Sequence, residues 1–128
     1  MGDTEESLSV GEMATRTGVS VHTLRYYERI GLLAGVPRTA GGRRVYGTKQ
    51  LASIEFISRL RETGMPIAQI LKYADLVRAE HDTRQQRLDI LVDHHRRVLT
   101  AIEEQHRHLK VIQTKIDLYR RDLARTDE

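Results

Sequence analysis

The C-terminal third of the chain is the feature that most restricts its fold. From Arg84 to Arg125 the sequence contains neither proline nor glycine, the two residues least compatible with a helix interior. Apolar residues recur there with the seven-residue period that is typical of a coiled coil. The pattern predicts one continuous helix of about forty residues, roughly 60 Å long.

A lone helix cannot bury an apolar stripe of this length, so the stripe predicts a partner helix. Because the chain holds one such segment, the simplest partner is a second copy in a two-fold symmetric homodimer. An intramolecular hairpin is the alternative, but the segment lacks turn residues, and the heptad leaves the direction of pairing open. With Leu88 at position a, the predicted dimerisation contacts are Leu88, Leu91, Val98, Ile102, Leu109, Ile112, Ile116 and Tyr119, and the pattern is interrupted at His95 and Gln105.

The segment from Ser9 to Leu33 predicts two short helices joined by a tight turn. Ser9 and Glu12 form a capping-box pattern ahead of a periodic segment that ends at residue 17. Gly18 and Ser20 then supply a turn residue and an N-cap for a second helix. Helix, turn and helix in this order are typical of a helix-turn-helix motif.

The second of these helices has two distinct faces. Helical spacing predicts that Leu24 faces inward, and that the outward-facing residues are His22, Arg25, Tyr26 and Arg29. An exposed arginine beside a tyrosine suits contact with a phosphate backbone. The alternative is that Tyr26 and Tyr27 are core aromatics next to a solvated arginine face.

The following segment, residues 34–47, predicts a β-hairpin or wing with its turn at Gly41 and Gly42. Arg38, Arg43 and Arg44 flank that turn. Guanidinium groups on a short projecting hairpin are costly to bury and well shaped for phosphates. A flexible, solvated loop is the alternative interpretation.

Two more helices are predicted after the wing. Thr48 is expected to cap a helix over residues 49–63, which Gly64 ends, and Pro66 to lie in the first turn of a helix that runs to about Arg78. Their apolar rows predict packing beneath the helix-turn-helix. The expected organisation is a disordered acidic leader over residues 1–8, a winged helix-turn-helix domain over residues 9–79 and a coiled-coil dimerisation helix over residues 80–128.

Positive charge is concentrated in the first part of the chain. Between Ser9 and Arg78 there are eleven Lys and Arg residues against five Asp and Glu, whereas the charges cancel from Ala79 onward. A basic head followed by a charge-balanced helix is typical of a domain that binds a polyanion.

Several classes of function find no support in the sequence. The absence of cysteine excludes disulfides, thiolate metal ligands and thiol-based sensing. No nucleophile–base pair, P-loop or Rossmann pattern is present, so we predict no enzymatic activity and no cofactor. Neither a signal peptide nor an apolar run long enough to span a bilayer is present, so we expect a cytoplasmic protein without a membrane partner.

The histidines of the long helix raise the alternative of a metal-dependent sensor. His94, His95, His106 and His108 all lie there, but none of them forms the i, i+4 pair that helical zinc sites use. Such a site would have to form across a dimer. We therefore predict no metal site, with a polar position at His95 as the simpler interpretation.

Three sequence blocks resemble the MerR family of bacterial transcription regulators. They are VGEMATRTGVSVHTLRYYERIGLL, PRTAGGRRVY and LASIEFISRLRETGMPIAQI, and the resemblance covers about Ser9 to the end of the chain. It implies a mainly α-helical, winged helix-turn-helix fold whose second helix enters the major groove while the wing contacts flanking backbone. By position, it implies DNA contacts from Arg25, Tyr26 and Tyr27 on the helix and from Arg43, Arg38 and Arg44 on the wing, with His22 and Thr23 as candidate base or phosphate neighbours.

The resemblance also implies a mechanism and a class of partners. Members of the family bind double-stranded promoter DNA as antiparallel dimers, and effector binding bends and untwists the DNA so that RNA polymerase can engage it. The region from IEFI onward further resembles an aldehyde- and electrophile-responsive branch, but Arg59 occupies the position of its sensing cysteine. We therefore expect a homodimeric, sequence-specific transcriptional regulator that responds to an unidentified signal. The alternative is an architectural or protein-interaction factor with a DNA-binding head and no small-molecule effector.

Overall fold

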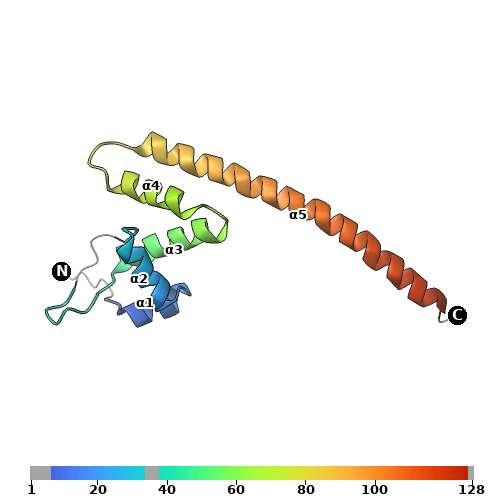
Figure 1. The fold of residues 1–128 in the computed structure, drawn as a ribbon, viewed down its shortest axis with the longest axis horizontal. Helices are drawn as coiled ribbons and strands as arrows, with labels where there is room; N and C mark the ends of the chain where they lie inside the picture. Colours follow the sequence, from blue (N-terminus) through green and yellow to red (C-terminus); the bar gives the residue numbers. More distant parts are fainter. Residues whose placement is uncertain (1–6, 34–37, 127–128) are drawn as a thin grey trace. The chain divides into compact units, whose positions relative to one another are not determined.

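The computed structural model describes residues 7–33 and 38–126, and within them it is built from five α-helices (Figure 1). The chain divides into two units: a head that ends at Arg87, and the rest of the last helix from Leu88 onward. A mainly α-helical fold that ends in one long helix was predicted, and it is confirmed. The helices are α1 (Val10–Thr17), α2 (Val21–Arg29), α3 (Thr48–Glu62), α4 (Ile67–Arg78) and α5 (Arg84–Thr126).

Helix α1 begins and ends at the residues that the sequence marks. The Ser9 hydroxyl accepts a hydrogen bond from the Glu12 N–H (3.2 Å), and the Glu12 carboxylate accepts one from the Ser9 N–H (3.0 Å), which confirms the capping box. The bond from the Ser9 N–H is the main cause that lowers the pKa of the Glu12 carboxyl. Gly18 ends the helix in a left-handed conformation (φ 74°), and its N–H donates to the Ala14 carbonyl.

Helix α2 starts at a side-chain cap and packs one face into the head. The Ser20 hydroxyl accepts a hydrogen bond from the Thr23 N–H (3.1 Å). Leu24 and Tyr27, three positions apart, are both buried. After the helix, the N–H of Leu32 donates to the Tyr27 carbonyl (2.8 Å), so the turn that follows is anchored on α2 itself.

Two helix starts differ from the predicted ones by one residue. Thr48 lies in the first turn of α3 rather than at its cap, because Gly47 takes the extended cap conformation and its N–H donates to the Gln50 side chain (2.8 Å). Pro66 is likewise the N-cap of α4, since its backbone is extended and the helix begins at Ile67. The buried faces of the two helices form much of the core, with Ile54, Ile57, Leu60, Ile70 and Ala74.

Leu8 belongs to the folded head and not to the leader in which we placed it. Its N–H donates to the Tyr46 carbonyl (2.7 Å), and the Tyr46 N–H donates back to the Leu8 carbonyl (2.8 Å). Both side chains are buried, so an apolar contact accompanies the backbone pairing. The rest of the predicted leader, residues 1–6, lies outside the described residues.

The connection into α5 is part of the head. Thr83 is buried, and its hydroxyl donates to the Leu76 carbonyl at the end of α4 (2.6 Å) and accepts from the Arg87 side chain (3.1 Å). The Asp82 carboxylate accepts a hydrogen bond from the Arg84 N–H (3.0 Å) at the helix start. These contacts join residues 82–87 to the end of α4, and the contacts of the head as a whole extend to Arg87.

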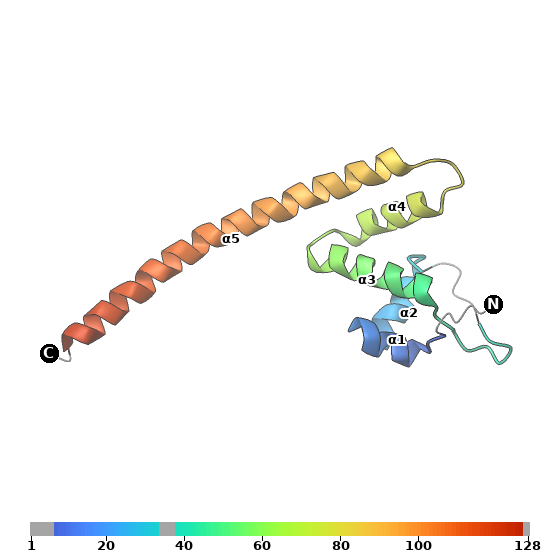
Figure 2. The same cartoon turned by 180° about the vertical axis from the view of Figure 1, so that it is seen from behind.

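Helix α5 runs without a break from Arg84 to Thr126, as Figure 2 shows. From Leu88 onward most of its heptad side chains are open to solvent in the single chain, and Leu91 and Val98 are half-buried. No helix in the described part of the chain is long and apolar enough to cross a bilayer. The exposed heptad residues are Leu88, Ile102, Leu109, Ile112, Ile116 and Tyr119.

Candidate nucleic-acid interface

The outer face of α2 carries two side chains that are free to bind an external partner. Arg25 and His22 are exposed, whereas Leu24 between them is fully buried. Among the described residues, neither exposed side chain makes a hydrogen bond or an ion pair within the chain. The prediction that Arg25 faces outward is therefore confirmed, and its guanidinium is available for a phosphate or a base edge.

Tyr26 is half-buried beside these residues and is covered by a cation. The Arg29 guanidinium lies 5.7 Å from the centre of the Tyr26 ring, a distance at which a cation–π interaction forms. Arg29 is four positions after Arg25, so both project from the same side of α2. Helical spacing predicted the outward position of Arg29, although we did not name it as a DNA contact, and its side chain is exposed.

Tyr27 does not lie on this surface, contrary to the contact that the resemblance implied. Its side chain is 1% exposed, and its hydroxyl accepts a hydrogen bond from Arg61 of α3 (3.0 Å). The Arg61 guanidinium also lies 5.8 Å from the centre of the ring. Tyr27 follows Leu24 by three positions, so the same helical period that buries Leu24 also buries it. Tyr27 therefore holds α2 against α3 on the buried side of the helix.

Thr23 serves the cap of α2 in this structure. Its hydroxyl accepts a hydrogen bond from the Ser20 hydroxyl (2.9 Å), and its N–H donates to the same Ser20 oxygen. The side chain is half-buried. A contact from Thr23 to DNA stays a prediction, as does one from His22.

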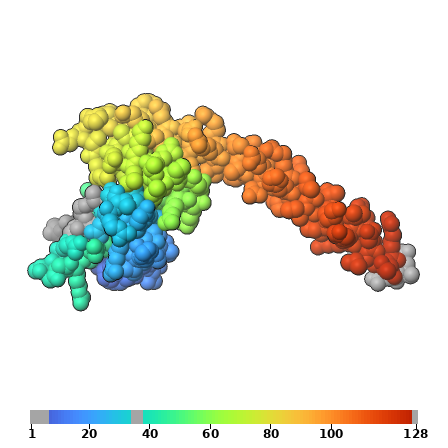
Figure 3. Space-filling view, viewed as in Figure 1, coloured from blue at the N-terminus to red at the C-terminus, as the bar shows by residue number. Residues whose placement is uncertain are grey.

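The predicted hairpin is formed between Arg38 and Arg44, which pair in antiparallel fashion. The Thr39 N–H donates to the Arg43 carbonyl (2.8 Å), and the Gly42 N–H donates to the Thr39 carbonyl (2.9 Å). Gly42 has a φ of 86°, which a residue with a side chain rarely adopts, so glycine suits this turn. The hairpin, teal in Figure 3, protrudes from the head. Residues 34–37 lie outside the described residues.

Glu28 of α2 holds the hairpin onto the helix. Its carboxylate accepts a hydrogen bond from Arg44 Nε and lies 3.6 Å from Arg38 Nη2, so it pairs with an arginine from each arm of the hairpin. The Glu28 side chain is 20% exposed, which reduces screening by solvent. Arg38 also donates to the Gly42 carbonyl (3.0 Å). We name this set, Glu28 with Arg38 and Arg44, the wing clamp.

The wing clamp distinguishes three arginines that the sequence treats alike. Arg38 and Arg44 are engaged within the chain, whereas the exposed Arg43 side chain makes no hydrogen bond or ion pair among the described residues. Arg43 therefore has the geometry of a direct phosphate contact. We did not predict from the sequence that Glu28 pairs with two arginines of the hairpin. A single acidic residue in so basic a segment could have indicated such an ion pair.

Tyr46 closes the base of the hairpin. Its ring is fully buried, and burial raises the pKa of its hydroxyl above the ordinary value, with the Glu28 carboxylate adding to the rise. The neutral phenol thus anchors the wing in the core. Together with the pairing between Tyr46 and Leu8, this fixes the start of the described chain beside the wing.

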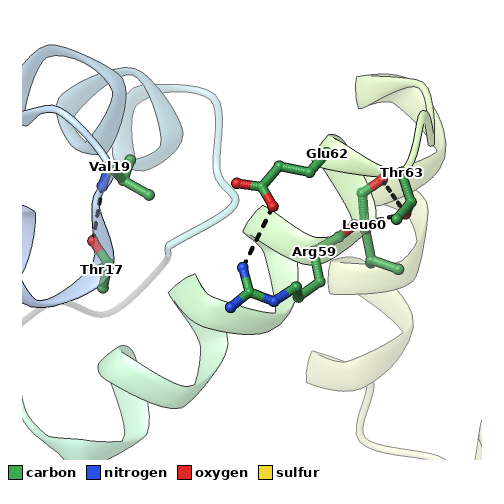
Figure 4. Close-up of polar contacts among 6 residues, drawn as sticks. All are labelled: Thr17, Val19, Arg59, Leu60, Glu62 and Thr63. Carbon is green, nitrogen blue, oxygen red and sulfur yellow. Dashed lines mark hydrogen bonds and ion pairs between the residues drawn. The ribbon is translucent and has the colours of Figure 1, made fainter.

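Arg59, which the resemblance places at the position of a sensing cysteine, is an exposed surface residue. Figure 4 shows its guanidinium turned toward Glu62, with Nη1 3.4 Å from the carboxylate oxygen and both side chains about 70% exposed. Its carbonyl accepts a hydrogen bond from the Thr63 hydroxyl (2.6 Å). Across residues 7–33 and 38–126, no three His, Asp or Glu side chains gather as a set of metal ligands.

Comparisons with known proteins match this architecture. The sequence model of the MerR HTH family regulatory proteins matches residues 8–76. A protein of Haemophilus influenzae, named as an uncharacterized HTH-type transcriptional regulator, is 29% identical over 91% of this chain and 86% of its own length. The HTH-type transcriptional regulator HmrR of Sinorhizobium medicae is 34% identical over 80% of this chain and 72% of its own.

The fold of this chain is also similar to that of a solved structure. The crystal structure of HiNmlR, a MerR family regulator lacking the sensor domain, bound to promoter DNA, superposes with a TM-score of 0.84 and 29% identity. The superposition covers 90% of this chain and 87% of that one.

Proposed function

We propose that this chain, which belongs to the MerR HTH family of regulatory proteins, is a transcriptional regulator that binds double-stranded promoter DNA through α2 and the wing. One observation carries the proposal. Arg25 on α2 and Arg43 on the hairpin are both exposed and unpaired among the described residues, and the wing clamp fixes one element against the other. The promoter DNA bound by HiNmlR supports the same partner.

The two free arginines have different tasks in this proposal. Helix α2 enters the major groove, where Arg25 reaches base edges or the adjacent backbone, and Tyr26 with Arg29 contributes phosphate contacts beside it. Arg43 contacts the backbone that flanks the groove. Arg38 and Arg44 act indirectly, because the wing clamp sets the angle at which Arg43 meets the DNA.

We further propose that the protein acts as an antiparallel homodimer through α5. The exposed apolar side chains Ile102, Leu109, Ile112 and Ile116 support this, since a stripe of that kind on one helix is stable in water only when a second helix covers it. A two-fold symmetric dimer reads a palindromic promoter, distorts it in response to a signal and presents it to RNA polymerase. This proposal gives the protein no enzymatic activity and places it in the cytoplasm.

The test of DNA reading compares a selected operator with random DNA. The operator is obtained by enrichment from a random duplex library, and affinities are measured by fluorescence anisotropy over a salt series. Arg25→Ala is expected to weaken operator binding strongly. Arg43→Ala is expected to weaken specific and non-specific binding alike and to lower the salt slope by about one. An operator-to-random ratio near one for the unmodified protein would contradict the regulator and favour the architectural alternative.

The test of the dimer uses a matched pair of substitutions on α5. Leu109→Asp places a charge in the predicted seam, whereas Val111→Asp places it outside the seam at a side chain that is 72% exposed. Sedimentation is expected to show a dimer for the unmodified protein and for Val111→Asp, and a monomer for Leu109→Asp. A Leu109→Asp protein that dimerises as before refutes the seam.

A further inference from the structure

The head carries an apolar groove between α3, α4 and the turn after α2, on residues that the proposed DNA surface does not use. Its volume is about 400 Å³. The apolar side chains that line it include Leu32, Leu33, Phe56, Ile57, Ile70 and Tyr73. A hollow of roughly 300 to 1,000 Å³ with apolar walls and a few polar groups is typical of a small-molecule site.

Two large apolar side chains at the rim of the groove are exposed. Phe56 and Val77 are 42% and 51% exposed, respectively. The rings of Phe56 and Tyr73 lie 5.7 Å apart and tilted by 50°, so they form an aromatic pair at the groove. These side chains suit a flat, apolar ligand.

Two cations, Lys49 and Arg78, and no carboxylate line the groove, and the nearby Asp75 carboxylate pairs with Arg78. The Lys49 ammonium makes no hydrogen bond or ion pair among the described residues, while Arg78 donates to the Gly31 carbonyl (2.8 Å) and to Asp75 (2.9 Å). We propose that this groove binds a small aromatic carboxylate, with its ring against Phe56 and its carboxylate between the two cations.

The size of the groove favours a small molecule over a protein segment as the occupant. A stable contact with a second protein buries about 800 Å² on each partner. A groove of about 400 Å³ has the size that holds one compact ligand. Occupation by a second copy of the chain is instead an outcome that the test distinguishes.

The groove is connected to the DNA-reading helix through the turn that follows it. The N–H groups of Leu32 and Leu33 both donate to the Tyr27 carbonyl of α2, and Arg78 holds the Gly31 carbonyl. A ligand carboxylate that accepts a hydrogen bond from Arg78 Nη2 competes with the Gly31 carbonyl and loosens the turn at residues 30–33 that follows α2. The ligand would thereby act as the signal of the regulator, a step that rests on the proposed function.

The first experiment measures binding to the full chain by isothermal titration. The probes are 2-naphthoate and its neutral analogue 2-naphthamide. We expect 2-naphthoate to bind at least tenfold more tightly, because charged hydrogen bonds to Lys49 and Arg78 distinguish the two. Val77→Asp, at the rim, is expected to weaken 2-naphthoate binding at least tenfold. Val111→Asp adds the same charge outside the groove and is expected to leave binding unchanged.

Each contrary result overturns the assignment of the groove. If 2-naphthoate and 2-naphthamide bind with equal affinity, Lys49 and Arg78 do not recognise the carboxylate. If Val77→Asp binds 2-naphthoate as tightly as the unmodified protein does, the ligand does not bind in this groove. A Val77→Asp protein that is a monomer in sedimentation, where the unmodified protein is a dimer, identifies the groove as a contact between copies. If this variant fails to fold, backbone amide shifts of Gly31, Lys49 and Arg78 in the unmodified protein decide, because bound 2-naphthoate must move them.

The second experiment separates this inference from the proposed function. Operator affinity is measured with and without saturating 2-naphthoate, and a change of at least threefold is expected that Arg78→Gln abolishes. Binding of 2-naphthoate without such a change overturns the signalling role and leaves DNA binding in place. Absence of operator binding in both conditions refutes the proposed function, whereas the titration still tests the groove.

Discussion

Replacing Glu28 by glutamine tests whether the wing clamp sets the specificity of DNA binding. Glutamine has nearly the same shape, so packing around α2 is kept. The change removes the charge that holds Arg44 and Arg38, the two arginines on opposite arms of the hairpin. The hairpin then loses its fixed angle to α2, and two guanidinium groups become available to phosphates.

The magnitude follows from the exposure of the partners. A hydrogen bond to a charged group contributes about 1.5 to 3 kcal/mol, and exposed ion pairs contribute about 0 to 1 kcal/mol. Arg44 and Glu28 are 29% and 20% exposed, so we assign their contact about 1.5 kcal/mol at the lower end of the first range. Arg38 is 49% exposed, and we assign its contact about 0.5 kcal/mol. The clamp therefore contributes about 2 kcal/mol to positioning the wing, and its loss is expected to weaken operator binding by about tenfold to thirtyfold.

The assay compares operator and random duplexes by fluorescence anisotropy at several salt concentrations. For Glu28→Gln we expect weaker operator binding and slightly stronger random binding, because the head gains one positive charge. Glu62→Gln is the matched control, since it removes the same charge from an exposed pair with Arg59, away from the wing. If Glu28→Gln and Glu62→Gln show the same operator-to-random ratio, the clamp does not position the wing.

Three further substitutions test local contacts of the head. Tyr27→Phe removes the acceptor for Arg61 and is expected to lower the free energy of unfolding by about 1 kcal/mol in chemical denaturation. Operator affinity should stay within twofold; a tenfold loss at unchanged stability would place the hydroxyl on DNA. Glu12→Gln keeps a hydrogen-bond acceptor but cannot ionise. Because the pKa of Glu12 is lowered in the folded state, its extra stability is present above about pH 4.5 and is lost as the pH falls through the lowered pKa. Thermal melts should therefore separate the two proteins at neutral pH and converge in acid, and a pH-independent difference would exclude this linkage. Gly18→Ala meets no atom within 4 Å but must adopt a φ of 74°, so we expect a loss of about 1 kcal/mol by denaturation; unchanged stability would show that the turn relaxes without strain.

Prediction from sequence succeeded where the determining contacts are local. The capping box at Ser9 and the left-handed turn at Gly18 depend on hydrogen bonds within four residues, so residue types in order identify them. The one-residue error at Thr48 has the same origin. Gly47 and Thr48 both suit a cap, and the reach of the Gln50 side chain selected the glycine.

Prediction failed where a residue's position depends on distant parts of the chain. The resemblance placed Tyr27 on DNA, but its hydroxyl partner, Arg61, lies 34 positions away. Leu8 looked like part of a polar leader until its backbone paired with Tyr46. Helical spacing indicated that Tyr27 could be buried, and the hydrophobicity of Leu8 indicated the same. The contacts with Arg61 and Tyr46 determined that both side chains are buried.

The sequence by itself determined the helices, the exposed Arg25, the hairpin turn and the long apolar stripe of α5, because periodicity and backbone preference act within a few residues. Only the tertiary structure decided which arginines of the wing are free. Arg38, Arg43 and Arg44 are equivalent as residue types, and they differ because Glu28, 16 positions before Arg44, reaches two of them and leaves Arg43 exposed. Charge pairing across the fold is a matter of distance in space, which residue order does not contain.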